Sequence, residues 1–473
     1  QMRNLKRALS LALAAIMLVG MMVVSASAAS YNNLTDKDEI VNKDAVSMLV
    51  SLGIIEGKPD GSYGPTENVD RAQMAKMLSV IMNKGVDNSA LYQSVNSGLT
   101  DITSHWAKGH INYCYTTGII AGRGTGTFDP SATVTALEAA KMLLVAVGYD
   151  PAIEGFEGAD WAINVSVRAD EQGIFEGFTK DLSAPLNRDD AALLIYNALD
   201  VEMIQSYTTN NYPIVYSDHR TILSDKYGVI KVEGVVTANE WAILDDDTDT
   251  ALQEGKTRIY NPDGILSTTG NTAVAQDSSA NVKTQVFNVS TPVDMLGKAV
   301  TMYVKKTTIL ADSTVYGAPV VSDVNTVIET GEKVTGGDSK DDDSLAALLK
   351  GTGLATDKAT EYYHNYEEVA IDSADVDDIM NVKGAALTVI DNDNDGYVNY
   401  VISVEKSLTH VSGVSSKNET TTLYGLPGDD VIDNEDIVTT ATDLTKGDVV
   451  LVVQYGGRTY VEEPKTCLLY TSP

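Results

Sequence analysis

The pattern of apolar and polar positions divides the chain into a helical front and a strand-rich remainder. In residues 99–143 apolar side chains recur at helical spacing, as at Ala107, Ile111 and Cys114, which predicts a helix with one buried face. From about Tyr207 onward, apolar residues alternate with polar ones, Thr and Val are frequent, and turns follow at short intervals. That alternation is typical of strands and hairpins. We therefore expect a multidomain chain, rich in helices first and mainly β afterwards.

The helical front contains an internal repeat. Residues 34–78 align with residues 99–143 without a gap, at a constant offset of 65 residues. A third, more diverged copy follows over residues 159–199, with a shorter link before its second helix. Each copy predicts a helix, a short apolar segment, a Gly turn and a second helix. Self-similarity of this kind indicates units that bury their apolar faces against one another. We place the three copies at residues 30–86, 95–150 and 151–205.

The start of the second helix in each copy contains a residue that helix capping does not explain. In "DRAQ", "TALE" and "NRDD" the first and last residues fit the N-cap and N3 positions. Arg71 and Arg188 occupy the first helical position, where a cation opposes the helix dipole, and the second copy has Ala136 there. Two interpretations stay open: a solvated surface arginine in an ion pair, or an anion site formed by the guanidinium and free first-turn N–H groups.

Two tryptophans also occupy equivalent positions. Trp106 and Trp161 lie at the start of the first helix of the second and third copies, where the first copy has Val41. Such a Trp either packs into the core or offers an indole face to a sugar ring, and the sequence leaves both open. Gly57 and Gly122 follow the short apolar segment, and turn geometry alone would account for them.

The stretch "HWAKGHINYCYTTGIIAGRGTGTFDP", followed by "VTALEAAKML", resembles the S-layer homology (SLH) domain. The resemblance covers residues 31–205, with three repeats in the usual order. It implies a pseudo-threefold helical module whose grooves, between neighbouring repeats, bind a secondary cell-wall polysaccharide non-covalently. That polymer is typically capped with a pyruvylated amino sugar, whose acidic group meets the arginine while the Trp lines the groove. The residues to which the resemblance assigns ligand binding are Arg71, Arg188, Trp106, Trp161, Gly57 and Gly122.

No copy matches the family pattern completely. The first copy lacks the Trp, the second lacks the Arg, and the third has an eroded turn. Because grooves form between neighbouring repeats, we expect Arg71 and Trp106 to complement one another. We also expect one or two working grooves and not three.

Both ends of the chain are expected to lie outside the mature fold. Basic residues precede an apolar run over residues 8–24 and the small residues "SASAAS", which is typical of a secretory signal peptide, so residues 1–29 are assigned to one. The final "CLLYTSP", residues 467–473, resembles the translation of a sequencing adaptor. We treat it as an artefact and expect the natural chain to continue past about Thr466.

The β-rich remainder is expected to form two domains. Residues 206–334 predict the first, the acidic stretch "TGGDSKDDDS" marks a linker over residues 335–360, and residues 361–466 predict a second, truncated domain. "VEGVV" (232–236) resembles "VSGVS" (411–415). "GKAVTMYV" likewise resembles "KGDVVLVV". These similarities favour a duplicated β-module.

The segment "DNDNDG" raises the question of a calcium site. Asp391, Asp393 and Asp395 fit the first, third and fifth ligand positions of an EF-hand loop, but Ile402 occupies the position of the bidentate Glu. Strands are predicted on both sides. A plain hairpin turn is therefore the favoured interpretation and calcium the alternative. No other cofactor is expected.

Charge and motif content exclude several function classes. The formal net charge of −32 argues against nucleic-acid binding and against anionic membrane surfaces. The chain has only five His residues and lacks H-E-x-x-H, G-x-S-x-G and phosphate-loop motifs, so we do not expect an enzyme.

Together these observations predict a secreted surface protein of a Gram-positive-type bacterium. Its repeats would anchor it to pyruvylated cell-wall polysaccharide, with no membrane segment in the mature form. Its acidic β-domains would project outward, with self-assembly into a surface lattice as a further option. The alternative is an anchored extracellular hydrolase whose catalytic domain lies beyond residue 466.

Overall fold

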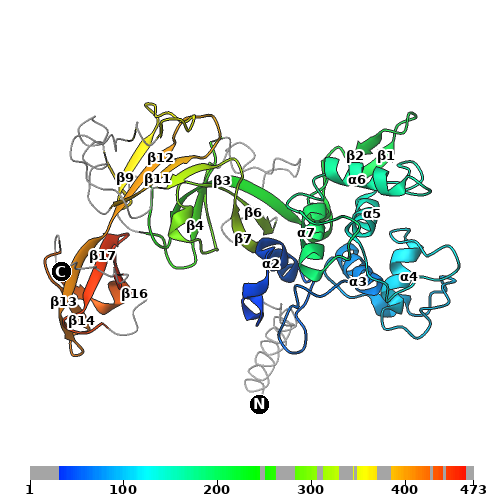
Figure 1. Ribbon diagram of the computed structural model, residues 1–473, viewed down its shortest axis with the longest axis horizontal. Helices are drawn as coiled ribbons and strands as arrows, with labels where there is room; N and C mark the ends of the chain where they lie inside the picture. Colours follow the sequence, from blue (N-terminus) through cyan, green and yellow to red (C-terminus); the bar gives the residue numbers. More distant parts are fainter. Residues whose placement is uncertain are drawn as a thin grey trace, which may run out of the picture.

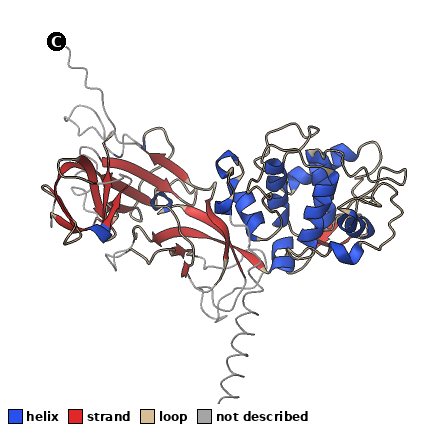
Figure 2. Cartoon of the chain, turned by 90° about the horizontal axis from the view of Figure 1, so that it is seen from below, coloured by secondary structure: helices blue, strands red, loops and turns tan. Residues whose placement is uncertain are grey.

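The computed structural model describes residues 31–244, 251–262, 283–305, 313–329, 345, 349–369, 385–426, 430–439 and 444–464. The predicted signal peptide at 1–29, the final residues 467–473 and residues 335–344 of the predicted linker lie outside the described residues. Helices gather at one end of the molecule and sheets at the other (Figure 1, Figure 2). The expected fold class, a helical module followed by mainly β domains, is therefore confirmed.

Six α-helices form the helical module, two from each copy of the repeat. They are α2 (Lys43–Ser51), α3 (Arg71–Met82), α4 (Lys108–Thr116), α5 (Ala136–Val147), α6 (Trp161–Glu171) and α7 (Arg188–Leu199). The shorter helical turns of the chain are η1 (Tyr31–Asn33), η2 (Lys37–Glu39), η3 (Ser89–Tyr92), η4 (Leu223–Tyr227), η5 (Val293–Met295) and η7 (Asn434–Asp436). Among the described residues, no helix is both long and apolar enough to cross a membrane.

The predicted caps determine where the second helix of each copy begins. In α5, the Thr135 hydroxyl accepts from the Glu138 N–H, and the Glu138 carboxylate accepts from the Thr135 N–H. The same reciprocal pair caps α3, and an Asn187 side chain caps α7. Each cap satisfies N–H groups that the helix itself leaves without a partner.

A closed ring of backbone hydrogen bonds joins the three copies immediately before these caps. The N–H of Val69 donates to the carbonyl of Leu186, that of Leu186 to Val134, and that of Val134 to Val69, at 2.8–2.9 Å. Each of these residues directly precedes an N-cap residue. The three segments therefore occupy equivalent places around a pseudo-threefold axis, even though the third has diverged in sequence.

The hydrophobic core of the helical module continues into the first β-sheet. Its buried residues include Leu78, Leu143 and Ile195 of the helices, together with Val229 and Tyr303 of the strands. The boundary expected at residue 205 therefore does not separate two independent cores.

Three larger sheets and one hairpin make up the rest of the described chain. The hairpin pairs β1 (Ile204–Tyr207) with β2 (Pro213–Val215). Sheet 1 is antiparallel in the order β5-β4-β3-β6-β7. Its strands are β3 (Val229–Asn239), β4 (Thr257–Tyr260), β5 (Thr284–Phe287), β6 (Ala299–Lys305) and β7 (Val315–Val321).

Sheet 2 has the order β10-β9-β12-β11-β8, and sheet 3 the order β15-β14-β13-β17-β18-β16. The strands of sheet 2 are β8 (Thr326–Glu329), β9 (Glu361–His364), β10 (Glu367–Glu368), β11 (Ala385–Asp391) and β12 (Tyr400–Glu405). Those of sheet 3 are β13 (Ser407–Ser415), β14 (Thr420–Leu423), β15 (Val431–Asp433), β16 (Ile437–Thr439), β17 (Val449–Tyr455) and β18 (Arg458–Glu462). Because β8 pairs with β11, strands on both sides of the predicted linker share one sheet.

Sheets 1 and 3 share a strand order, which supports the predicted duplication. The residues that are equivalent in the two sheets, however, are not the ones that the sequence similarity pairs. Gly297 N–H donates to Val236 O, as Gly447 N–H donates to Val411 O. A bulge follows Val236 and Val411 in turn. Val411 is therefore equivalent to Val236, and the alignment of "VEGVV" with "VSGVS", which pairs it with Val232, is wrong by four residues. Strand pairing and bulges set the register, and short sequence similarity does not.

Candidate functional site

Two grooves on the helical module each bring together residues from all three copies. Groove 1, about 340 Å³, is lined by Gly57, Trp106 and Arg188 from the first, second and third copies. Groove 2, about 560 Å³, is lined by Gly122, Trp161 and Arg71 from the second, third and first copies. All six residues predicted to bind the polymer thus line one of the two grooves.

The expected pairing of Arg71 with Trp106 is wrong, because the two residues line different grooves. Each groove combines a Gly turn with the arginine of the preceding copy and the Trp of the following copy, counted around the ring. Arg71 therefore shares groove 2 with Trp161, and Arg188 shares groove 1 with Trp106.

The guanidinium group of Arg71 is held by backbone carbonyls. Its Nε donates to Phe128 O at 2.9 Å, and its Nη2 donates to Ala121 O at 2.8 Å. The guanidinium carbon lies 4.4 Å from the centre of the Phe128 ring, and Arg71 is only 5% exposed. Burial, with a smaller effect of the nearby Arg123, lowers the pKa of Arg71 to about 10, so the group stays charged at neutral pH.

Arg188 repeats this arrangement at the equivalent positions of the first copy. Its Nε donates to Tyr63 O at 2.8 Å and its Nη2 to Glu56 O at 3.3 Å. The guanidinium carbon lies 4.7 Å from the centre of the Tyr63 ring. Tyr63 and Glu56 are related to Phe128 and Ala121 by the same offset of 65 residues that relates the first two copies.

Neither arginine forms an ion pair with a carboxylate in the described part of the chain. Nearby acids pair with other cations: Glu67 with Lys58 and Glu138 with Arg123. The interpretation as a solvated ion-paired arginine therefore does not hold. A fixed guanidinium whose charge is not neutralised can bind an anion through the donors that remain.

The N–H groups of the first helical turn are not available to a ligand, contrary to the expectation from sequence. In α3, the Arg71 and Ala72 N–H groups donate to carbonyls of the second copy, and the Gln73 N–H donates to the Asp70 cap. The first turn of α7 is used in the same way. Any anion bound in these grooves must therefore rely on side chains.

Two aspartates that the sequence analysis did not single out position the carbonyls. Asp101 accepts from the N–H groups of Phe128 and Asp129 at 2.9 and 2.7 Å. Asp36 accepts from those of Tyr63 and Gly64, both at 2.7 Å. These bonds hold the turns whose carbonyls then bind the arginines. The sequence could have pointed to them, because the two aspartates occupy equivalent positions of the first two copies.

The tryptophans differ in exposure. Trp106 is 55% exposed, so it is not a core residue, and its ring lies near the rings of His105 and His110. Trp161 is half-buried, and the Lys141 ammonium lies 5.6 Å from its ring centre. An exposed indole face is suited to packing against a sugar ring.

The two groove glycines have a structural reason of their own. A Cβ at Gly122 would lie 2.8 Å from Thr127 O, and one at Gly57 would lie 3.0 Å from a methyl group of Leu34. Both turns therefore need glycine for close packing, whether or not a ligand is bound.

The three aspartates of "DNDNDG" lie in the predicted hairpin turn between β11 and β12. Their carboxylate oxygens lie within 4.8 Å of one another. The buried Asp391 already accepts from the N–H groups of Asn394 and Gly396, at 2.8 and 3.1 Å. Calcium binding by Asp391, Asp393 and Asp395 stays a prediction.

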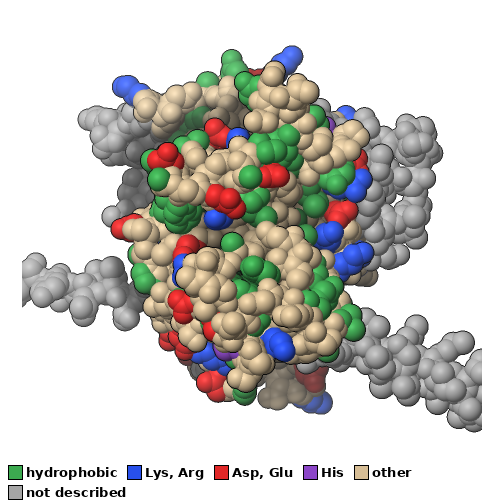
Figure 3. Space-filling model, turned by 90° about the vertical axis from the view of Figure 1, so that its right-hand side faces the viewer, with side chains coloured by type: hydrophobic (Ala, Val, Ile, Leu, Met, Phe, Trp, Pro, Cys, Tyr) green, Lys and Arg blue, Asp and Glu red, His purple; other side chains and the backbone are tan. Residues whose placement is uncertain are grey.

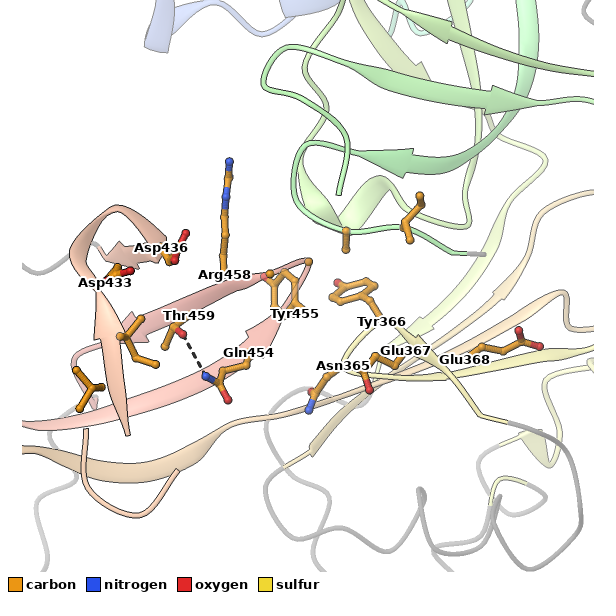
Figure 4. Close-up of a pocket in the computed structure, with 16 residues that line it drawn as sticks. Asn365, Tyr366, Glu367, Glu368, Asp433, Asp436, Gln454, Tyr455, Arg458 and Thr459 are labelled. Atoms are coloured by element: carbon orange, nitrogen blue, oxygen red, sulfur yellow. Dashed lines mark hydrogen bonds between the residues drawn. The ribbon is translucent and has the colours of Figure 1, made fainter. Parts of the chain in front are cut away.

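A larger cavity, about 1000 Å³, lies in the β-rich region between sheets 2 and 3 (Figure 4). None of the predicted site residues lines it. Two aromatic side chains line it, Tyr366 and Tyr455, whose ring centres lie 4.8 Å apart, and the Tyr455 ring also stacks on Tyr460 outside the lining at 4.1 Å. These contacts occupy much of the aromatic surface that a sugar would need.

Comparison with known proteins identifies the helical module. The family model of the S-layer homology domain matches residues 33–75 and 98–140. A "Cell surface protein" of Thermoanaerobacter kivui is 26% identical over 394 residues, 83% of this chain and 44% of the relative. An "S-layer protein" of Bacillus licheniformis is 33% identical over 113 residues, 24% of this chain and 12% of the relative.

The relatives also include a protein of another kind. An amylopullulanase of Thermoanaerobacterium thermosulfurigenes is 30% identical over 173 residues, 33% of this chain and 9% of the relative. The chain spans less than half the length of each of these three relatives. It contains two S-layer homology domains, and it is a cell-surface protein associated with the cell wall.

Proposed function

We propose that grooves 1 and 2 anchor the protein non-covalently to an acidic, pyruvylated cell-wall polysaccharide. The observation that carries this proposal is the matched pair of guanidinium groups, Arg71 and Arg188. Each is held by two carbonyls, is left without a carboxylate partner in the described residues, and shares its groove with a Trp. The guanidinium would bind the pyruvyl carboxylate, and the indole would pack against the sugar ring.

The third segment would be a third SLH repeat that completes the module without adding a binding site. Its Leu186 closes the hydrogen-bonded ring, which supports this assignment. The remaining place between copies carries Ala136 where the other grooves have Arg, and Val41 where they have Trp. We therefore expect two polymer-binding sites per chain.

Recognition would be local, because the protein and the proposed polymer are both acidic. The net charge is −32, and long-range attraction to an anion is absent. Viewed end-on, the helical module shows acidic and basic side chains interspersed, without one basic patch (Figure 3). Close contacts at the two fixed arginines would supply the affinity.

The test is the double variant Arg71→Gln plus Arg188→Gln, with binding measured to purified wall polysaccharide. We expect about 10- to 100-fold weaker binding, because each groove loses a charge-assisted contact. Arg123→Gln is the matched control, since Arg123 lines groove 2 but is paired with Glu138. The full chain should be used because the helical core extends into sheet 1. Equal binding of the double variant and the parent would refute the proposal.

An anchored hydrolase is the alternative function, favoured by the similarity to the amylopullulanase. The same grooves would then hold a catalytic domain at the cell wall. Glycan and peptide hydrolysis by the natural full-length protein separates this from a structural role. For the structural role we propose assembly into a surface lattice, which electron microscopy of the purified protein would test.

A further inference from the structure

Two further cations line each groove besides Arg188 or Arg71, and one of the two is a lysine of the second helix. Lys76 lines groove 1 and Lys141 lines groove 2. The two lysines are equivalent residues of α3 and α5, related by the offset of 65. Each groove therefore combines the arginine at the start of one second helix with a lysine from the second helix of the next copy.

The position equivalent to grooves 1 and 2 at the Gly turn of the third copy, here called the third place between copies, provides an internal comparison. The equivalent of the two lysines is Leu193, whose side chain lies 3.7 Å from where a Cβ of Gly177 would be, so it faces the third Gly turn. The other two positions there are Ala136 and Val41. Arg, Lys and Trp are thus present together in two grooves and absent together from the third. A lysine needed for folding would be expected in all three copies, since the ring and the helix caps recur in all three.

The two lysines have no close carboxylate partner among the described residues, unlike Lys58 and Arg123 of the same grooves. Lys141 donates to the carbonyl of Phe156 and lies beside the Trp161 ring. Burial lowers the pKa of Lys141, Glu157 opposes this, and the nearby charge of Arg71 lowers it further. Two like charges in one cavity favour an anion between them.

In groove 1 the lysine has only a loose partner. The Lys76 ammonium lies 3.7 Å from the carboxylate of Glu56, whose side chain is 71% exposed, and such surface pairs contribute little. By contrast, Lys58 and Arg123, which also line the two grooves at equivalent positions, pair closely with Glu67 and Glu138.

We propose that Lys76 and Lys141 bind the ligand directly, each contacting an anionic or hydroxyl oxygen of the sugar unit that packs on the tryptophan of its groove. This inference rests on the proposed function. It narrows the ligand to an acidic saccharide that contacts the guanidinium group of the arginine and the ammonium group of the lysine in the same groove. The helix N–H groups are already used, and Lys58 and Arg123 are paired with Glu67 and Glu138. The lysine is therefore the second positive group that each groove offers without a close carboxylate partner.

The experiment compares Lys76→Gln plus Lys141→Gln with the parent, in the full chain. Binding to purified acidic wall polysaccharide is measured by calorimetry at low and high salt, and the thermal midpoint is recorded for each variant. We expect about tenfold or weaker binding, a shallower salt dependence and an unchanged midpoint. Lys37→Gln plus Lys43→Gln, at two lysines of the helical module that line neither groove, is the matched control and should bind as the parent does. Lys76→Arg plus Lys141→Arg should restore most of the affinity.

The outcomes separate this inference from the proposed function. If the parent fails to bind the polymer, the proposed function is wrong. If the parent binds and the glutamine variant binds equally well, the lysines are not ligand-binding residues. A loss of affinity that is the same at both salt concentrations, with a lower thermal midpoint, would assign the lysines a structural role and overturn the inference. Lys76→Gln alone keeps the test decisive, because this exposed side chain can be changed without loss of packing.

Discussion

Asp36 and Asp101 are the residues on which the geometry of both grooves depends. Each carboxylate binds two backbone N–H groups of a turn, and the carbonyl of that turn then fixes the arginine of another copy. Burial raises the pKa of both carboxyls, but the backbone hydrogen bonds outweigh it, so both pKa values are lowered overall. At the residue scale, the positions of Arg71 and Arg188 therefore depend on two aspartates that contact the turns and not the arginines.

The lowered pKa values give a prediction for pH. A carboxyl with a lower pKa in the folded state stabilises the fold above its unfolded pKa of about 4 and loses that contribution as the pH falls through the folded value. We expect the stability of the helical module to fall below about pH 4. The double variant Asp36→Asn plus Asp101→Asn should be less stable at neutral pH and less sensitive to acid, measured as thermal midpoint against pH. An unchanged acid sensitivity in that variant would contradict the assignment.

At the scale of elements, the caps and the hydrogen-bonded ring set where each second helix starts. Thr135 shows this most simply, because its cap is reciprocal and the next residue is Ala136, which has no guanidinium group such as the one proposed to bind the ligand in Arg71. The start of α5 thus has a structural role that can be separated from binding.

Thr135→Ala is therefore predicted to lower stability and leave polymer affinity unchanged. Loss of an N-cap costs about 1 kcal/mol, which denaturant unfolding can resolve. Thr135→Ser, which keeps the hydroxyl, is the control and should stay close to the parent. A large affinity loss in Thr135→Ala would contradict the separation of the cap from binding.

At the scale of the whole molecule, the helical module and sheet 1 are one folding unit. The Tyr196 and Tyr303 rings meet edge-on at 5.9 Å, and the turn at Gly317 in β7 lies against Met48 of α2. The helical module and sheet 1 are therefore joined through a packed interface and not through a flexible linker.

Cutting the chain after residue 205 should accordingly weaken the helical module. The cut removes Val229 and Tyr303, which belong to the same core as the helices. Each large apolar side chain of the helices that becomes exposed costs about 1.5–3 kcal/mol of stability. We expect residues 30–205 to unfold at a lower temperature than residues 30–329 and to bind more of a hydrophobic dye. Equal unfolding temperatures would show that the interface does not stabilise the module.

The capped helices, the Gly turns, the threefold repetition and the β-rich remainder followed from the sequence by itself, because caps, turns and apolar periodicity depend on neighbouring residues. The residues of the grooves could also be chosen from their repeat positions. Only the tertiary structure decided which Arg shares a groove with which Trp and which carbonyls of other copies bind the helix N–H groups. It also decided the register of the duplicated sheets and placed the lysines in the grooves of the tryptophans. Each depends on contacts between segments far apart in the chain, where the closed ring and strand pairing set the geometry and local pattern carries no information about it.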